Sequence, residues 1–514
     1  MPTNLQSNTR YKRLLKRSLL SITVILVITL AIAYYLLYLR VTNSGLTFTN
    51  PLQIPTLLEA TEQEGQKIFE LTPQSGQVAF LDGQLAKTMG YNGHYLGPTI
   101  RVSRGDNVII NVTNQLDEMT TVHWHGLHVP PDMDGTPHQA IMPGETWQAR
   151  YPILNEAATM WYHPHPHGQS AQQVFQGLAG LFIIDDENSD QLNLPNSYCI
   201  DYIPLIIQDR LIDEDGELHY ELNKGAYYGD TILVNGTHNP FITVPAKQIR
   251  LRLLNGSNAR VYHFGFDSNQ LFHQIATDGG LLEAPVPTTR VRLSPGERAE
   301  IIVDLSHGQE TLLKSYPEDD LLLLAESLFL DNIGNSYFDI LKLVPESTNA
   351  PLDHQVDADL PPTLNQIKRW RPEDVVKVRT ITLAGPITEG DQPAGPGPTI
   401  PINGKLMDMG RIDEVVTLGD VEIWEVTNIG GQAHPFHIHD IQFLILDRDG
   451  VPPEANEAGW KDTVLIGVNE TVRFITQFTT YANPDVPYMY HCHILEHEDG
   501  GMMGQFIVIE PDSQ

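Results

Sequence analysis

The sequence predicts an all-β chain of three similar β-sandwich domains, preceded by one membrane-spanning helix at the N-terminus. Three observations support this prediction. The chain has 514 residues, which is too long for one ordinary domain. It holds 36 Pro and 40 Gly among short runs rich in Val, Ile and Thr, a composition typical of strands joined by turns. One strand–turn–strand motif also occurs three times along the chain.

The first 40 residues contain six Lys or Arg and no Asp or Glu. Within them, residues 18–39 carry no charge, and as a helix they would span roughly 30 Å, the thickness of a hydrocarbon core. The basic flank favours a cytoplasmic segment 1–17, an uncleaved transmembrane signal anchor 18–39, and an exposed tether 40–74. This predicts a single-pass protein of the cell membrane with an extracytoplasmic body. The alternative is a cleaved signal peptide, with a cleavage box at 31–33, and secretion.

The repeated motif is a short strand, a turn and a second strand that ends in Asn. Its three copies end at Asn114, Asn255 and Asn428, and this spacing predicts three equivalent sandwiches. Histidine pairs follow the first and third copies but not the second, so the middle domain is expected to be a spacer without metal ligands. The predicted boundaries are 75–190 for the first domain, 191–345 for the second, 346–372 for a linker and 373–514 for the third.

The body of the chain is strongly acidic. The residues after position 40 carry 26 basic and 64 acidic side chains, a net charge near −38. Such a surface excludes nucleic acid as a partner and attracts cations, although a plain solubility adaptation explains it equally well. If Cys492 ligates a metal, the only other cysteine, Cys199, has no partner, so no disulfide is expected.

Soft and borderline metal ligands gather near the C-terminus, where His491, Cys492, His493, His497 and Met502 lie within twelve residues. A thiol, imidazoles and a thioether together favour copper over zinc or calcium. On a strand, Cys492 would face one way and its two histidine neighbours the other, so one strand could bind copper on both sides.

Two ligand sets follow from this pattern. His434, which precedes a proline outside the strand pattern, completes a His₂Cys trigonal set with Cys492 and His497. Met502 is the expected weak axial ligand, while its neighbour Met503 is better explained as a core residue. Eight imidazoles in His-x-His pairs can fill a three-metal cluster between two domains, namely His123 and His125, His163 and His165, His437 and His439, and His491 and His493.

Five motifs in this sequence resemble the copper signatures of three-domain multicopper oxidases, nearest the bacterial copper-efflux oxidase and laccase branch. They are His-Trp-His-Gly-Leu at 123–127, Trp-Tyr-His-Pro-His-Pro-His-Gly at 161–168, Gly-Leu-Ala-Gly-Leu at 177–181, His-Pro-Phe-His-Ile-His at 434–439, and the run 491–503. The resemblance covers roughly residues 75–512. It implies three cupredoxin-like Greek-key sandwiches that couple one-electron oxidation of a reducing substrate to four-electron reduction of O₂ to water.

The resemblance also implies four copper ions and assigns their ligands. The type 1 copper takes His434, Cys492, His497 and Met502. The type 2 copper takes His123 and His437, and the binuclear type 3 pair takes His125, His163, His165, His439, His491 and His493. Asp134 and Glu498 match acids that relay protons in the family. The simpler interpretations are that Asp134 is a turn residue and that Glu498 orients a ligand histidine.

The sequence also differs from copper-efflux members of the family. None of the 11 Met lies between residues 310 and 405, and the run 428–433 before His434 contains no acid. These differences favour laccase-type oxidation of phenols or aromatic amines, and a monomer is expected. The alternative is a metal-ion oxidase acting on Cu(I), Mn(II) or Fe(II), and a more distant one is a non-catalytic copper-binding protein. A two-domain nitrite reductase is disfavoured by the third domain and the eight-histidine set.

Overall fold

The computed structural model describes residues 46–81, 83–223, 225–318, 337–346, 360–385 and 397–511, with a few single residues between Lys16 and Thr29. Most of the expected anchor, residues 18–39, lies outside these ranges, as does the part 347–359 of the expected linker 346–372. Across the described parts of the chain, no helix is both long and apolar enough to cross a bilayer.

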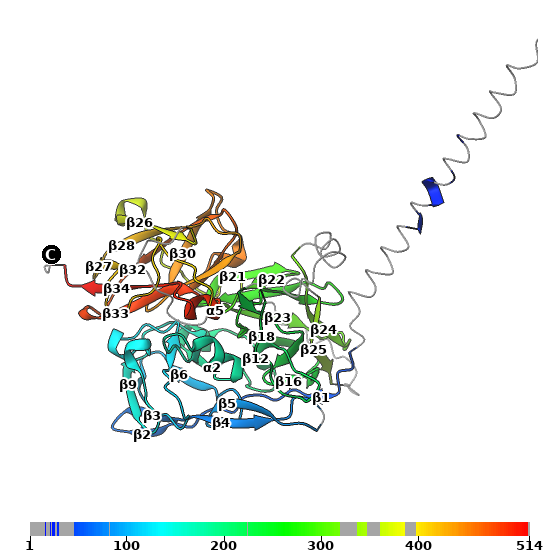
Figure 1. The fold of residues 1–514 in the computed structure, drawn as a ribbon. Coiled ribbons are helices and arrows are strands. Elements are labelled where there is room, and N and C mark those ends of the chain that lie inside the picture. The colour runs from blue at the N-terminus through cyan, green and yellow to red at the C-terminus, as the bar shows by residue number, and fades with distance from the viewer. Residues whose placement is uncertain are drawn as a thin grey trace, which may run out of the picture.

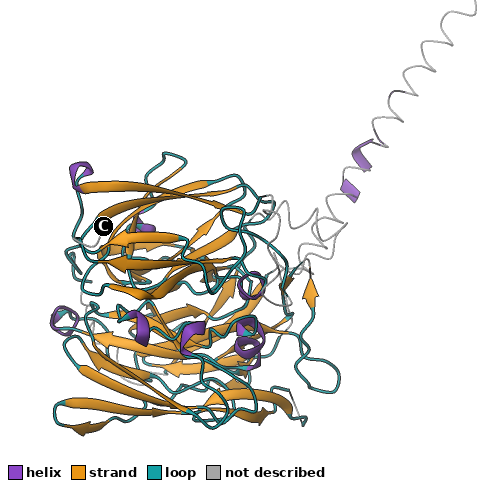
Figure 2. Cartoon of the chain, turned by 60° about the vertical axis from the view of Figure 1, so that its left-hand side comes forward, coloured by secondary structure: helices purple, strands orange, loops and turns teal. Residues whose placement is uncertain are grey.

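The regular secondary structure of the described body is mostly strand, which confirms the predicted β-sandwich class (Figures 1 and 2). Its helices are short and lie between strands: α2 (Ser170–Gln176), α3 (Glu187–Gln191), α5 (Leu495–Asp499) and four 3-10 turns, η1 (Pro131–Met133), η2 (Pro137–Gln139), η3 (Pro372–Asp374) and η4 (Ala455–Glu457). The main sheets form three pairs, each enclosing one apolar core, and these pairs are called the first, second and third sandwich.

The first sandwich pairs two four-stranded sheets and carries one additional hairpin. The first sheet has the order β2 (Thr61–Gln63), β3 (Gln66–Leu71), β7 (Asn107–Thr113), β9 (Thr146–Pro152). The second has the order β6 (Ile100–Ser103), β11 (Gly180–Asp185), β10 (Ala158–His163), β8 (His123–His125). The hairpin is β4 (Pro73–Val78) with β5 (Ala86–Tyr91).

The second sandwich pairs a seven-stranded with a six-stranded sheet. The larger sheet has the order β16 (Thr237–His238), β15 (Thr231–Val234), β12 (Tyr202–Arg210), β18 (Gln248–Asn255), β23 (Arg298–Asp304), β20 (Phe272–Thr277), β21 (Gly280–Thr288). The smaller has the order β1 (Asn50–Pro51), β17 (Pro240–Val244), β25 (Phe338–Pro345), β24 (Thr311–Ser315), β19 (Tyr262–Phe266), β22 (Val291–Leu293). A short ribbon joins β13 (Leu222–Asn223) to β14 (Ala226–Tyr227).

The third sandwich, yellow to red in Figure 1, carries the C-terminal ligand run. One sheet has the order β26 (Val375–Leu383), β28 (Val421–Asn428), β32 (Thr471–Gln477), β30 (Phe443–Arg448). The other has the order β27 (Glu414–Thr417), β34 (Met503–Ile509), β33 (Asn483–Cys492), β29 (His434–Ile438), β31 (Thr463–Ile466).

The three copies of the sequence motif occupy equivalent places in the three sandwiches. Their first strands, β6, β17 and β27, each pair in parallel with a later strand. Their second strands, β7, β18 and β28, each lie between one parallel and one antiparallel neighbour. The repeat therefore marks three copies of one strand arrangement.

The asparagine that ends each copy explains why this residue recurs. Asn114, Asn255 and Asn428 are fully buried. In each, the side-chain oxygen accepts from the backbone N–H two residues later, and the amide donates to one carbonyl oxygen in the following loop and to another in a later segment of the same sandwich. The same Asx turn thus fixes the loop that leads to the histidine motifs in the first and third sandwiches.

Two local expectations differ from the structure. The tether expected over 40–74 already pairs with the body at β1 and β3, because Phe69 and Leu71 of β3 are buried in the first core. His434, expected outside the strand pattern, is the first residue of β29 and pairs with Ile466. Its proline neighbour is tolerated because a strand can include proline where no ladder N–H is needed.

Candidate metal centres

Three of the four residues expected at the type 1 site lie together beside the end of β33. Cys492 Sγ is 3.4 Å from His434 Nδ1 and 3.6 Å from His497 Nδ1, and the two nitrogens are 3.3 Å apart. A point equidistant from three such atoms lies about 2 Å from each, close to the length of a metal–nitrogen or metal–sulfur bond. The triangle therefore has the right size for one metal ion.

Backbone pairing brings these three side chains together. Phe436 of β29 pairs with Cys492 of β33, which places His434 two residues away at the same end of the sheet. The chain then turns into α5, which returns His497 to the thiol. Met502 is buried in the same core as Cys492, and its carbonyl accepts from the Cys492 N–H at 3.1 Å.

The protonation of this group suits a cation. Burial lowers the pKa of His434 to about 4 and that of His497 to about 3, so both imidazoles are neutral at neutral pH and free to bind a metal. Burial raises the pKa of the Cys492 thiol. A bound transition-metal ion would have the opposite effect, because a thiol that coordinates such an ion is deprotonated. His₂Cys with a nearby thioether is the donor set of a blue-copper site.

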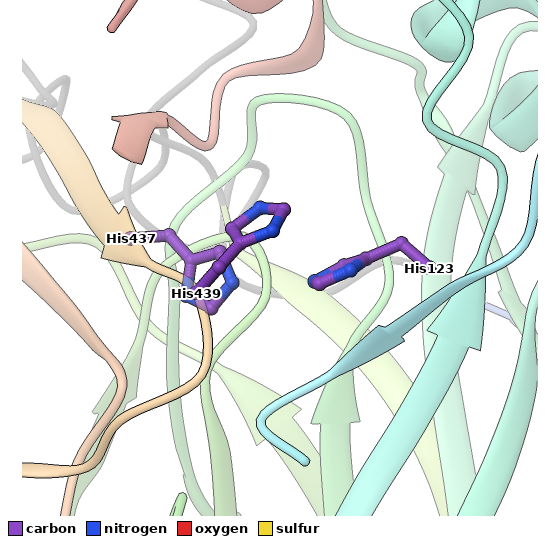
Figure 3. Close-up of side chains that lie close together, drawn as sticks. All are labelled: His123, His437 and His439. Carbon is purple, nitrogen blue, oxygen red and sulfur yellow. The ribbon is translucent and has the colours of Figure 1, made fainter. Parts of the chain in front are cut away.

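The eight imidazoles of the four His-x-His pairs form one buried cluster between the first and third sandwiches. Figure 3 shows His123 reaching toward His437 and His439 from a separate segment. The all-histidine groups of three, with their ligand atoms within 4.8 Å of one another, are His123, His437 and His439; His123, His125 and His163; and His165, His439 and His491, and a further group joins His125 and His437 to Asp462. His493 completes the cluster, since its ring lies 5.0 Å from that of His125.

Only the His123–His125 pair lies wholly in a strand, β8. In the other three pairs the strand ends at or just after the first histidine, so the second ring is placed by the following turn. The two-faced strand expected at 491–493 is therefore a strand that ends at Cys492, with His493 just beyond it.

Hydrogen bonds to one ring nitrogen direct the other nitrogen into the cluster. The Nδ1 atoms contact backbone carbonyl oxygens in His123 (Asp134, 2.9 Å), His163 (Pro164, 3.0 Å), His437 (Asp462, 2.8 Å) and His491 (Cys492, 3.1 Å). His125 is reversed, because its Nε2 faces Asp462 Oδ1 at 3.1 Å and its Nδ1 faces His163 Nε2 at 3.4 Å. These contacts fix the tautomers as metal ligands require.

Several buried ring nitrogens have no hydrogen-bond partner, including Nε2 of His123, His437 and His493. Unpaired polar atoms in a fully buried site are costly, and metal ions would satisfy them. Burial and neighbouring imidazoles also lower the pKa of His437, and burial lowers that of His493 to about 3. The residues present therefore fit a cluster of copper ions.

Both expected proton-relay acids lie against this cluster. Asp134 Oδ2 accepts from His439 Nδ1 at 2.7 Å, and its other oxygen is 3.3 Å from His123 Nδ1. Glu498 lies 3.3 Å from Nδ1 of both His165 and His491, but neither contact has hydrogen-bond geometry. Burial raises the pKa of Glu498, whereas the two imidazoles outweigh burial at Asp134 and hold its pKa well below the usual range.

Sequence reasoning missed Asp462, whose carboxylate contacts His125 and whose backbone carbonyl orients His437. It also missed Arg298 of the second sandwich, which forms a two-pronged ion pair with Asp462. Neither residue lies in a histidine motif, and only the packing of the sandwiches brings them to the cluster.

Gly135 tightens the turn that presents Asp134, and replacing it by Ala should destabilise the protein. Its φ is +79°, and a Cβ would lie 1.7 Å from the Val122 carbonyl oxygen. Gly144 has a nearly equal φ of +81° but no atom within 4 Å of a Cβ. Gly144→Ala should cost about 1–2 kcal/mol for the left-handed backbone alone. Gly135→Ala should cost about 1–3 kcal/mol more from overpacking. Comparing the thermal unfolding of the two variants tests this, and equal midpoints would contradict it.

Comparison with known proteins agrees with this geometry. Two sequence profiles, both described as multicopper oxidase, match residues 72–189 and 372–512. The chain is 36% identical to the multicopper oxidase mco of Staphylococcus aureus, over 89% of this chain and 92% of that protein. The structure of a laccase-like multicopper oxidase, CueO of Ochrobactrum sp., matches with a TM-score of 0.78 at 35% identity, over 89% of this chain and 100% of that one. A Campylobacter jejuni multicopper oxidase, described as a metallo-oxidase, gives 0.76 at 30% identity, over 90% and 96%.

The stacked β-sandwiches and their two histidine-rich centres define a copper-dependent oxidoreductase. Both profile matches and the identity to a multicopper oxidase over most of both chains show that the chain belongs to the bacterial multicopper oxidase family. Enzymes of this family use O₂ and a reducing substrate.

Proposed function

We propose that the protein is a four-copper oxidase with laccase-type activity. The observation that carries the proposal is the His434–Cys492–His497 triangle, joined through the flanking His491 and His493 to the eight-imidazole cluster. The assigned ligands are His434, Cys492, His497 and Met502 for type 1 copper, His123 and His437 for type 2, and His125, His163, His165, His439, His491 and His493 for type 3. When bound, these copper ions would supply the one-electron redox chemistry that takes O₂ to water.

The chain's own residues would connect and orient the two centres. Cys492 is covalently joined to His491 and His493, and its carbonyl oxygen lies 3.1 Å from His491 Nδ1, so a covalent and a hydrogen-bonded route run between them. Asp134 holds His439 and lies beside His123, while Glu498 lies between His165 and His491. Glu498, whose carboxyl pKa is raised by burial, is suited to hold and deliver a proton for water formation, whereas Asp134, whose pKa is lowered by the two imidazoles, is suited to accept a proton and pass it on.

The preferred reducing substrates are phenols and aromatic amines. Two sequence features support this choice, since residues 310–405 contain no Met and residues 428–433 contain no acid. The Ochrobactrum protein, described as laccase-like and active on lignin model compounds, points the same way. The second candidate is metal-ion oxidation, favoured by the acidic body and by the Campylobacter metallo-oxidase.

A substrate panel on copper-loaded protein, scored by oxygen uptake, tests the proposal. We expect four copper ions per chain and faster oxygen uptake with a methoxyphenol than with Cu(I), Mn(II) or Fe(II). Faster uptake with a metal ion would establish the second candidate instead. Phenol oxidation that persists in copper-free protein would exclude both.

We further propose a monomeric body tethered to the outer face of the cell membrane. The uncharged segment 18–39 and its basic flank support the tether, and cleavage followed by secretion is the alternative. Carbonate-washed membranes should retain the protein, and removing residues 1–39 while supplying a cleavable export signal should release it. Recovery in the culture medium of a chain shortened by cleavage near residues 31–33 would favour secretion. Light scattering of the released body tests the monomer.

A further inference from the structure

Arg298 begins β23 of the second sandwich and contacts all three sandwiches. Its guanidinium donates to both carboxylate oxygens of Asp462 in the third sandwich, each at 2.7 Å. Its Nε donates to the Thr159 carbonyl oxygen of the first sandwich at 2.8 Å, and its own backbone N–H donates to Asp278. The side chains of Arg298 and Asp462 are fully buried. A bidentate pair of this kind fixes the orientation of the carboxylate and also stabilises its negative charge.

Asp462, held in this way, contacts two imidazoles of the cluster and orients them. Its Oδ1 lies 3.1 Å from His125 Nε2, and its backbone carbonyl oxygen lies 2.8 Å from His437 Nδ1. These two rings come from different sandwiches and stack with their centroids 3.8 Å apart. The orientation of His125, which presents Nδ1 rather than Nε2 to the cluster, thus depends on a carboxylate that Arg298 holds.

The turn before Arg298 forms part of the wall of the cluster. A Cβ added at Gly296 would lie 3.0 Å from the His493 ring and 3.1 Å from that of His125. On the other side, a Cβ at Gly126 would lie 2.5 Å from Asp462 and 2.8 Å from Arg298. Both positions have φ above +80°, which favours glycine. The backbone of the second sandwich therefore lies directly against two ligand rings.

We propose that the second sandwich, although it supplies no copper ligand, positions the trinuclear copper site through Arg298 and the Gly296 turn. This inference rests on the proposed function, because it assumes copper at the eight imidazoles. It makes Arg298 a positioning residue that acts through Asp462 on His125 and His437. The second domain, which the sequence predicted to be a spacer, therefore contributes to the geometry of the metal centre.

The strand that carries Arg298 also provides a matched control. Glu300, two residues along β23, pairs with Arg252 of β18 at 2.6 Å, and Arg252 also contacts the side chain of Thr159 at 2.7 Å. This arginine is as buried as Arg298 and reaches the same residue of the first sandwich. No contact between Arg252 and the imidazole cluster occurs in the described part of the structure. Replacing either arginine removes a buried ion pair and a contact with Thr159 of the first sandwich, but only the Arg298 pair contacts residues that orient the imidazoles.

Arg298→Met and Arg252→Met in the full chain separate positioning from plain stability. Each copper-loaded protein is challenged with a chelator, its remaining copper is counted per chain, and the blue absorption reports the type 1 site separately. We expect Arg298→Met to retain the blue centre and bind trinuclear copper roughly 10- to 100-fold more weakly. Its type 2 electron paramagnetic resonance signal should change, while Arg252→Met should keep both the copper and the signal of the unaltered protein.

Equal copper retention and unchanged spectra in the two variants would overturn the inference. If either methionine variant is insoluble, Arg298→Lys and Arg252→Lys repeat the comparison with the charge kept. Arg298→Lys should show intermediate copper retention, because an ammonium group cannot hold both carboxylate oxygens in one plane. Retention equal to that of Arg252→Lys would again overturn the inference. An unaltered protein that binds no copper at the eight imidazoles would instead refute the proposed function.

Discussion

Replacing Cys492 by Ser should abolish the blue colour and lower oxygen consumption by more than about a hundredfold. Loss of a residue that only supports a metal ligand already costs up to about a hundredfold, and Cys492 is proposed to bind the metal directly. The Cys492 thiol is one corner of the triangle with His434 and His497, and a serine hydroxyl cannot supply the thiolate that gives a blue copper site its colour. The eight imidazoles are untouched by this change, so most of the copper should remain bound.

Oxygen uptake, copper content and the visible spectrum measured on one preparation decide this prediction. Cys199→Ser is the matched control, because Cys199 is exposed and far along the chain from every proposed ligand. The control should behave like the unaltered protein in all three measurements. Undiminished oxygen uptake by Cys492→Ser would refute the assigned connection between the two centres.

Glu498→Gln should slow the reoxidation of fully reduced protein by O₂ by roughly 10²- to 10⁴-fold, the usual contribution of a positioned general acid. Glu498 is buried between His165 and His491, and burial raises the pKa of its carboxyl group, which favours the protonated form next to the cluster. Glutamine preserves the shape and can still contact the rings, but it cannot deliver that proton. Copper content and the rate at which substrate reduces the blue centre should be unchanged.

Glu496→Gln serves as the control for this experiment. Glu496 is buried on the same helix, but its carboxylate accepts from Tyr220 and Asn258 of the second sandwich rather than facing the cluster. Stopped-flow reoxidation of the two variants should therefore differ by orders of magnitude. If Glu498→Gln reoxidises at the rate of Glu496→Gln, Glu498 only orients its neighbours and another group supplies the proton.

Much of the fold could be predicted from the sequence because strand motifs and ligand motifs are local. The repeat ending at Asn114, Asn255 and Asn428 predicted three equivalent units, and the same Asx turn in each gives a physical reason for its recurrence. The chemistry of the ligand motifs likewise predicted that distant histidines would meet. The copper assignments themselves remain predictions for the loading experiments.

What could not be predicted depends on contacts between sandwiches. Arg298 and Asp462 are 164 positions apart, and neither residue lies in a histidine motif. Their role exists only because three sandwiches pack around one point. His434 was misplaced for a different reason: the proline after it suggested a strand break, whereas the strand pairing within the third sandwich begins at His434, which pairs with Ile466.

The division of the histidine cluster between two ends of the chain also sets an order of assembly. His123 to His165 belong to the first sandwich, whereas His437 to His493 belong to the last. During synthesis the early half of the cluster has no counterpart until the final hundred or so residues have folded, so copper bound by both halves would have to enter after the body is complete. Bound ions would then link the first and third sandwiches, and their binding free energy would stabilise the contact between these two sandwiches.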